Sequence, residues 1–163
     1  MTKYVKLYED YQQDINKMTE ETGHTWTQLR DTIQTKMPFV IITFANTESY
    51  SEALDSDLFK GDYIKQTAAL SDNGSLVDYP SIFMALDNSA DFKNKIPQTF
   101  EKYKIRTLIL GKKGEDYVDY YYNDGTSSPA GNEIISSISK DDMTNDEHFK
   151  MGSTYYKFID FAG

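Results

Sequence analysis

The sequence predicts a single α+β domain, in which an N-terminal helical hairpin at residues 1–37 precedes an α+β body at residues 38–163. Apolar residues recur at helical spacing near the N-terminus, whereas the remainder holds short runs of β-branched and aromatic residues. Strict alternation of strands and helices, which a parallel doubly wound sheet needs, fails where two such runs flank a tight turn. We therefore expect the body to be an antiparallel or mixed sheet with short helices.

Two amphipathic stretches predict the helical hairpin. The second stretch begins with a capping box at Thr25, which places Gln28 at the third helical position. Leu29 and Ile33 continue its apolar stripe, and Pro38 ends it. The apolar residues of the first stretch are Tyr4, Leu7, Tyr8, Tyr11, Ile15 and Met18.

The first part of the body is predicted to hold a strand, a short helix and a turn. Residues 39–44, FVIITF, have the length and composition of a central strand. Residues 49–52 match a second capping box and predict a short helix that Gly61 closes. Residues 63–68 extend or follow this helix, and the Asp-Asn-Gly sequence at residues 72–74 predicts a turn.

The next part contains the clearest hairpin. Residues 81–86 predict either a buried strand or a short helix, because their period does not separate the two. Helical spacing recurs over residues 92–103, where Pro97 kinks the helix or begins a new one. Residues 105–110 and 116–122 predict two strands joined by a Gly-Lys-Lys-Gly turn.

The C-terminal part has weaker patterns. Residues 123–132 are rich in turn-forming residues and predict a mobile loop. Residues 139–150 are polar and acidic and predict one or two helical turns. Residues 154–161, TYYKFIDF, predict a closing strand.

Charge is distributed in blocks along the chain. The net charge of −9 divides into −1 over residues 1–47, −7 over residues 48–91, +6 over residues 92–114 and −7 over residues 115–163. Two acidic segments therefore lie on either side of a basic island. Lysines spread among the acids would be ordinary surface counter-charges, whereas gathered lysines would form an anion-binding patch. The basic island consists of Lys93, Lys95, Lys102, Lys104, Arg106, Lys112 and Lys113.

Composition and spacing exclude several kinds of site. The chain has no cysteine and therefore no disulfide, thiolate nucleophile or iron–sulfur cluster. The only histidines, His24 and His148, lack a zinc-binding spacing, and no nucleophile elbow or phosphate-binding glycine loop occurs. We expect no catalytic residues, no metal, no cofactor and no enzymatic activity. Because no signal-peptide or membrane-span pattern is present, we expect a cytoplasmic protein with no membrane partner.

The acidic segments and the tyrosine-rich strands predict a protein-binding module. Carboxylates that do not form an ordinary solvated surface would attract a basic partner such as a nucleic-acid enzyme, with tyrosines as anchors. This composition is similar to that of DNA-mimic inhibitors carried by phages and other mobile elements, which block such a partner by steric and electrostatic competition. A mimic needs both acidic segments on one face and the basic island on another. The candidate contact residues are Glu48, Glu52, Asp55, Asp57, Asp62, Asp116, Asp119, Tyr117, Tyr121, Asp141, Asp142 and Asp146.

The alternative function is a small transcriptional regulator. Residues 15–34 have the outline of a helix-turn-helix, with a glycine at the turn. The segment has a net negative charge, so its attraction to phosphates is weak, and we do not expect direct nucleic-acid binding. The sequence leaves a homodimer open. The residues that would contact DNA are Thr27, Gln28, Arg30, Gln34 and Lys36.

Overall fold

The structure is a computed structural model that describes residues 26–56 and 63–158. Residues 26–34 form a helix, and three α-helices and one 3₁₀ helix follow. These are α2 (Thr47–Leu54), α3 (Ser89–Lys93), α4 (Ile96–Lys102) and η2 (Lys140–Met143). The strands are β1 (Phe39–Phe44), β2 (Tyr63–Asp72), β3 (Ser75–Ala85), β4 (Ile105–Gly111), β5 (Tyr117–Tyr122), β6 (Ser127–Gly131), β7 (Ile134–Ser137), β8 (His148–Met151) and β9 (Thr154–Phe158).

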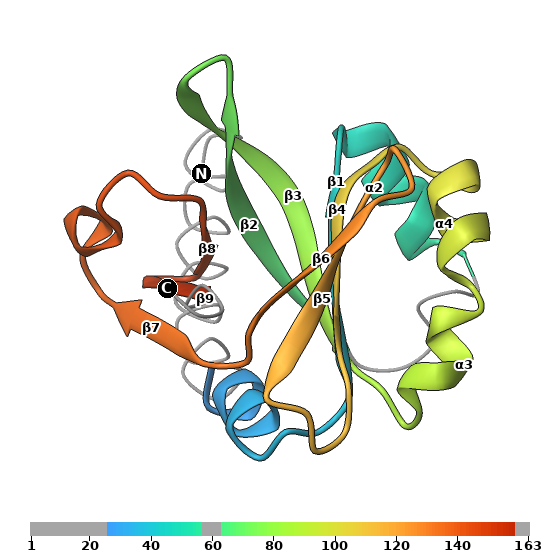
Figure 1. Cartoon of the computed structure of the whole chain (residues 1–163). Helices are drawn as coiled ribbons and strands as arrows, with labels where there is room; N and C mark the ends of the chain where they lie inside the picture. Colours follow the sequence, from blue (N-terminus) through green and yellow to red (C-terminus); the bar gives the residue numbers. More distant parts are fainter. Residues whose placement is uncertain (1–25, 57–62, 159–163) are drawn as a thin grey trace, which may run out of the picture.

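The nine strands form one antiparallel sheet in the order β6-β5-β4-β1-β3-β2-β8-β9-β7. The edge strands β6 and β7 are consecutive in the chain and are joined by only two residues, Asn132 and Glu133. Such a short link requires the opposite edges of the sheet to meet at one end. Figure 1 shows the resulting curvature, with β6 and β7 diverging from their link. The sheet is therefore a half-barrel with one open side.

This architecture corrects the predicted fold class. Strands hold 46% of the described residues and helices 26%, so the fold is mainly an antiparallel sheet with a few short helices. Within residues 26–56 and 63–158, the structure shows no N-terminal helical hairpin leading into an α+β body. The first predicted helix, at residues 4–18, lies outside the described residues. The second is present over residues 26–34, with Leu29 and Ile33 buried.

Two local predictions are wrong because strand pairing outweighs weak local preference. Residues 63–68 are not helical but belong to β2, which pairs with β3 along its whole length. Residues 123–132 are not a loop throughout, because they contain the edge strand β6. Pro129 is compatible with that strand because prolines are tolerated at sheet edges.

Other predictions are confirmed. The β1 strand lies between β3 and β4 with all six residues buried, and β4 and β5 form the expected hairpin. Asn73 and Gly74 have φ values of 54° and 84°, as a tight hairpin turn requires. Pro97 lies in the first turn of the new helix α4, which begins at Ile96. The capping box at residues 49–52 is wrong, since Asn46 caps α2 by accepting a 2.8 Å hydrogen bond from the Ser49 amide.

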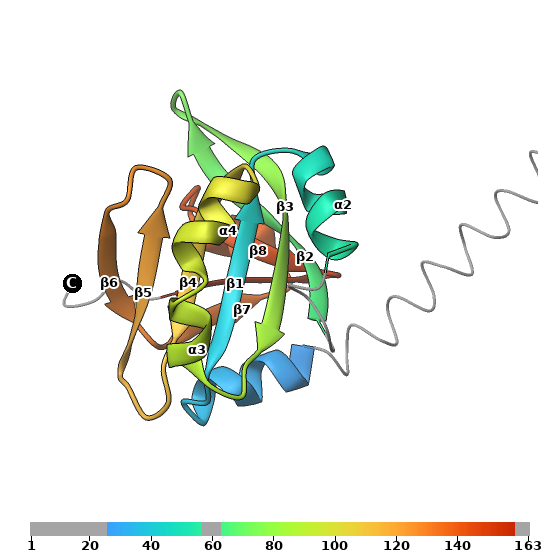
Figure 2. The same cartoon turned by 90° about the vertical axis from the view of Figure 1, so that its right-hand side faces the viewer.

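The two faces of the sheet build two separate cores. On the face that we call the outer face, α2, α3 and α4 cover the central strands (Figure 2). The buried residues of this outer core are Val40, Ile42, Phe44, Ala53, Ile82, Met84, Phe92, Ile96, Tyr103, Ile105, Leu108 and Leu110. Because side chains alternate along a strand, the intervening residues project to the inner face.

The inner core is richer in aromatic rings. The helix over residues 26–34 contributes Leu29 and Ile33, and Trp26 packs against Tyr156 with a centroid separation of 5.4 Å. The other buried residues of this inner core are Phe39, Ile41, Ala68, Leu70, Phe83, Ile109, Val118, Ala130, Phe149, Met151, Tyr156 and Phe158. The inner core fills the closed end of the half-barrel and leaves the open side for a cleft.

Candidate binding cleft

A cleft of about 540 Å³ lies on the inner face, between the β5–β6 hairpin and the segment from β7 to β9. This volume is within the range of pockets that hold small ligands or single side chains of a partner. Seven strands and the turn before β8 contribute to its walls. No short sequence motif encodes it, because its walls meet only through the curvature of the sheet.

The floor of the cleft is apolar and its walls carry tyrosine rings. Ala130, Phe149 and Phe158 belong to the inner core and also line the cleft. Tyr120 and Tyr122 project from β5 to the same face. The Tyr120 ring lies edge-on to Phe158 at 6.4 Å between centroids, and the Tyr122 and Ser128 hydroxyls are 3.3 Å apart. A flat apolar or cationic group could contact both rings.

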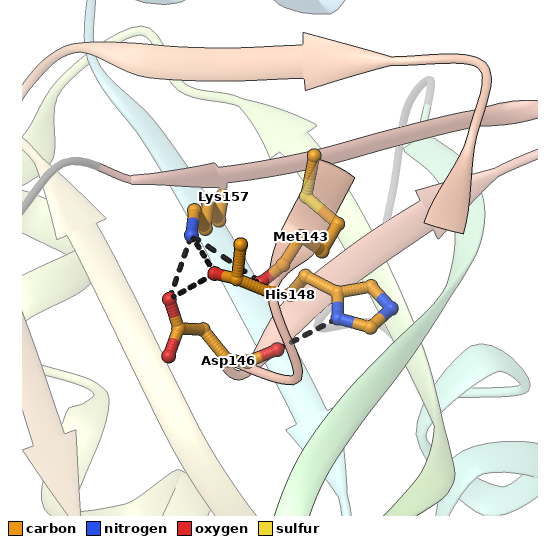
Figure 3. A network of polar contacts seen from close by, with 5 residues as sticks. Met143, Asp146, His148 and Lys157 are labelled. Atoms are coloured by element: carbon orange, nitrogen blue, oxygen red, sulfur yellow. Dashed lines mark hydrogen bonds and ion pairs between the residues drawn. The ribbon is translucent and has the colours of Figure 1, made fainter. Parts of the chain in front are cut away.

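One rim of the cleft is a network of charged and polar groups around Asp146 (Figure 3). Lys157 Nζ lies 2.7 Å from Asp146 Oδ2, and the Thr144 hydroxyl donates to the same oxygen at 3.0 Å. These hydrogen bonds, first that of Lys157 and then that of Thr144, lower the pKa of Asp146 below its ordinary value. The carboxylate is therefore charged at neutral pH, and the only lysine of the cleft is already paired with it.

The next two residues fix this rim to the sheet. The Ser71 amide donates to Glu147 Oε2 at 2.7 Å, which continues the contact between β2 and β8. His148 is buried, and its Nδ1 lies 2.8 Å from the Asp146 carbonyl oxygen. Because a carbonyl can only accept, Nδ1 carries the proton in this contact. The carboxylates of Asp146 and Glu147 are therefore held at the rim by an ordered turn.

A chain of buried polar groups runs through the inner core. Tyr156 donates to Gln66 Oε1 at 2.5 Å, and Gln66 Nε2 donates to the Ser81 hydroxyl at 3.2 Å. The Thr43 hydroxyl donates to the same Ser81 oxygen at 3.1 Å. Burial raises the pKa of Tyr156, so its hydroxyl stays protonated and acts as the donor. This chain links β9 to β2, β3 and β1.

The described contact residues predicted on the first acidic segment do not line the cleft. Glu48, Glu52 and Asp55 belong to α2 or its C-terminal cap. The helix α2 lies on the outer face of the sheet (Figure 1). Asp55 lines a shallow second cavity together with Lys95 and Lys102 of the basic island. Part of the basic island therefore lies beside the first acidic segment. The two other predicted contact residues of this segment, Asp57 and Asp62, lie outside the described residues.

The second acidic segment is divided between two places. Asp116 pairs with Lys36, and Asp119 pairs with Lys112 at 2.6 Å. Asp141 and Asp142 lie in η2, and Asp146 follows at the cleft. Figure 1 shows η2 and α2 at opposite sides of the molecule. The contact residues predicted on α2 and those predicted on η2 thus do not share one face (Figure 1), as DNA mimicry would require.

The tyrosines that line the cleft are not those predicted for the interface. Tyr121 packs against the outer core, and the Lys112 ammonium lies 5.4 Å from the centroid of the Tyr117 ring. The cleft uses Tyr120 and Tyr122 instead. Alternation along β5 is the signal that could have found them, because it places them on the same face as Val118.

Four of the five alternative DNA-contacting residues belong to a helix that is packed against the sheet. Thr27, Gln28 and Gln34 are exposed, and Arg30 Nε lies 3.7 Å from Asp31 Oδ1. Lys36 follows the helix with a φ of 55°, and its carbonyl accepts from the Gly114 amide at 2.8 Å. Since its ammonium also pairs with Asp116, Lys36 holds the helix to the β4–β5 hairpin.

No group of three or more potential metal ligands occurs within residues 26–56 and 63–158. In the same ranges, no helix has the length and apolarity needed to cross a membrane. No protein-family model matches the chain, and neither a curated protein nor a solved structure matches it. The case for a function therefore rests on the geometry and chemistry of the cleft.

Proposed function

We propose that the chain is an acidic protein-binding module without catalytic activity, and that the cleft receives a cationic side chain of its partner. The observation that carries this proposal is the pairing of tyrosine walls with a carboxylate rim. Asp146 and Glu147 lie at the rim, and Tyr120 and Tyr122 line the same cleft of about 540 Å³. An ammonium or guanidinium group is attracted by both kinds of surface.

Electrostatics favours a cation over an anion in this cleft. Lys157 is the only lysine or arginine among the lining residues, and Asp146 neutralises it. Glu147 retains lone pairs for a further donor after accepting from the Ser71 amide. The net charge of −9 attracts a basic partner at longer range and raises the rate of encounter at low salt.

The test uses a lysine- and arginine-rich peptide as the probe and a glutamate-rich peptide as its counterpart. We expect one-to-one binding of the basic peptide by titration calorimetry, weakened by salt because charge drives the encounter. Asp146→Asn and Tyr122→Ser should each weaken binding by roughly tenfold, the equivalent of about 1.4 kcal/mol. Equal loss in all acidic variants, or no binding, would contradict the proposal.

The matched control is Glu52→Gln, which removes one exposed carboxylate from α2 on the outer face. It changes the net charge by the same amount as Asp146→Asn, so a purely global charge effect would weaken both variants equally. Retention of duplex DNA at low salt would favour the regulator instead. In that case, substitution of Arg30 should abolish retention.

A further inference from the structure

The two edges of the sheet differ in how they are protected against a further strand. On β6, Pro129 lies opposite Asp119 of β5. Hydrogen bonds from Tyr122 to Thr126 and from Asn132 to Asp116 flank this pairing and set its alternation, so that Pro129 is in a pair without ladder bonds. Its nitrogen therefore faces the open edge, where it has no proton to donate.

The other edge strand, β7, has no such protection. Residues 134–139, IISSIS, contain neither proline nor a charged residue. Ile135 is 45% exposed and lines the cleft, and Ile138, directly after β7, is 84% exposed. A protein avoids exposed aliphatic residues on an edge strand unless that edge receives another chain.

The free hydrogen-bonding groups of β7 follow from the register of the sheet. The two-residue turn of the β8–β9 hairpin makes Met151 and Thr154 a hydrogen-bonded pair. Alternation along β9 then directs the main-chain groups of Ile135 and Ser137 toward β9. The N–H and C=O groups of Ser136 consequently point to the open edge, as do those of Ile134.

The surroundings of β7 favour a basic partner over a second copy of the chain. Five acids and one lysine occur over residues 133–147, which gives this stretch a net charge of −4. Two copies that each carry a net charge of −9 would repel one another along this edge. A segment with lysines or arginines around an aliphatic centre matches both the charges and the exposed isoleucines.

We propose that β7 is a docking edge on which an extended basic segment of the partner adds as a further strand. This inference rests on the proposed function and specifies how the partner binds. The backbone of the segment pairs with Ser136, and its aliphatic side chains cover Ile135 and Ile138. Because Ile135 also lines the cleft, a lysine or arginine of the same segment can reach the carboxylate rim at Asp146.

The test uses the peptide Lys-Lys-Val-Thr-Val-Thr-Val-Lys-Lys as an extended basic probe. We expect it to bind and to slow hydrogen exchange of the Ser136 amide, which the register directs to the open edge. The same peptide methylated at its central backbone amides should bind at least tenfold more weakly, since it cannot supply the ladder hydrogen bonds. Equal binding of the two peptides would overturn the docking edge.

Variants of the two edges give a matched comparison. Ser136→Pro removes an outward N–H group from β7 and should weaken binding of the peptide by about tenfold. Ser127→Pro is the control, because it places a second proline on the edge of β6, which already carries Pro129. Thermal unfolding checks that both variants fold. If Ser136→Pro does not fold, hydrogen exchange of the Ser136 amide in the unaltered chain still shows whether the peptide binds at β7.

The outcomes separate this inference from the proposed function. Suppose that Asp146→Asn weakens binding of the peptide, that Ser136→Pro does not, and that the Ser136 amide stays unprotected. The cleft proposal then stands and the docking edge fails. If no basic peptide binds, both fail. Concentration-dependent dimerisation that Ser136→Pro abolishes would identify a second copy as the occupant of β7 and would overturn the basic partner.

Discussion

The outer and inner faces of the sheet share strands β1, β3 and β4 but build two unlike cores. The outer core consists mainly of aliphatic residues under three helices, whereas the inner core holds stacked rings, a buried polar chain and the margin of the cleft. The difference indicates that the two cores have different roles. The outer core stabilises the fold by burying apolar area. The inner core also buries apolar area, but it borders the cleft, where that burial is incomplete.

The largest expected difference between the faces is in the cost of removing a leucine. Leu108 is fully buried in the outer core, so Leu108→Ala should lower the free energy of unfolding by about 3–5 kcal/mol. Leu70 lines the cleft, where water can fill the space that Leu70→Ala leaves. We expect its cost to be about 2 kcal/mol. Denaturant unfolding measures the free energy of unfolding of both variants, and equal losses would contradict the different roles of the two cores.

A second difference concerns packing at the closed end of the inner core. Gly111 in β4 lies against the Phe39 ring, and a Cβ built at Gly111 would overlap that ring. Gly111→Ala should therefore lower the free energy of unfolding by about 1–3 kcal/mol through overpacking. Side chains that border the cleft should tolerate a change of size better. Gly125→Ala gives a comparison with a different cause, because a Cβ there meets nothing within 4 Å and its cost comes from the φ of 86°. It reports the backbone effect alone.

The buried polar chain provides a third contrast, since no such chain crosses the described part of the outer core. Gln66→Leu leaves the Tyr156 hydroxyl without its acceptor and should cost about 1–3 kcal/mol. Adding Tyr156→Phe removes the stranded hydroxyl and should recover part of that loss. A double-mutant cycle by denaturant unfolding measures the coupling, and strictly additive losses would show that the pair is not a unit.

Sequence patterns predicted the central strand better than the edge strand β6. The run at residues 39–44 is buried on both faces, so its composition alone identifies a central strand. The β6 strand contains only small residues and proline, and nothing in its composition indicates that β5 recruits it. The residue pattern also could not show that the exposed acids of α2 and η2 point to opposite sides of the molecule.

The cleft was not predictable because its parts meet only after the sheet curves. Leu70, Tyr120 and Lys157 come from β2, β5 and β9, with long intervals of sequence between them. Asp146 was singled out among many acids only by its place in an acidic segment. Asp116 and Asp119 also pair with lysines, but Asp146 does so at the rim of the cleft, where its place depends on the register of η2, β8 and β9.

The smallest expected effect is on titration of the cleft rim. The Lys157 and Thr144 hydrogen bonds lower the pKa of Asp146, so its carboxylate favours the folded state above the ordinary carboxyl pKa. That contribution is lost as the pH falls through the lowered pKa. Lys157→Met should return the midpoint of Asp146, followed by carboxyl carbon NMR, toward the ordinary value of about 3.9.

Asp124 serves as the control for this titration. Its pKa is also lowered, but by hydrogen bonds from Thr126 in the β5–β6 turn, so Lys157→Met should leave it unchanged. A shift of both carboxyls would indicate a change in the whole fold. A shift of neither would mean that Lys157 does not hold Asp146 in solution. The ammonium would then be free to repel a cationic ligand, which would remove the electrostatic basis for placing a basic side chain in the cleft.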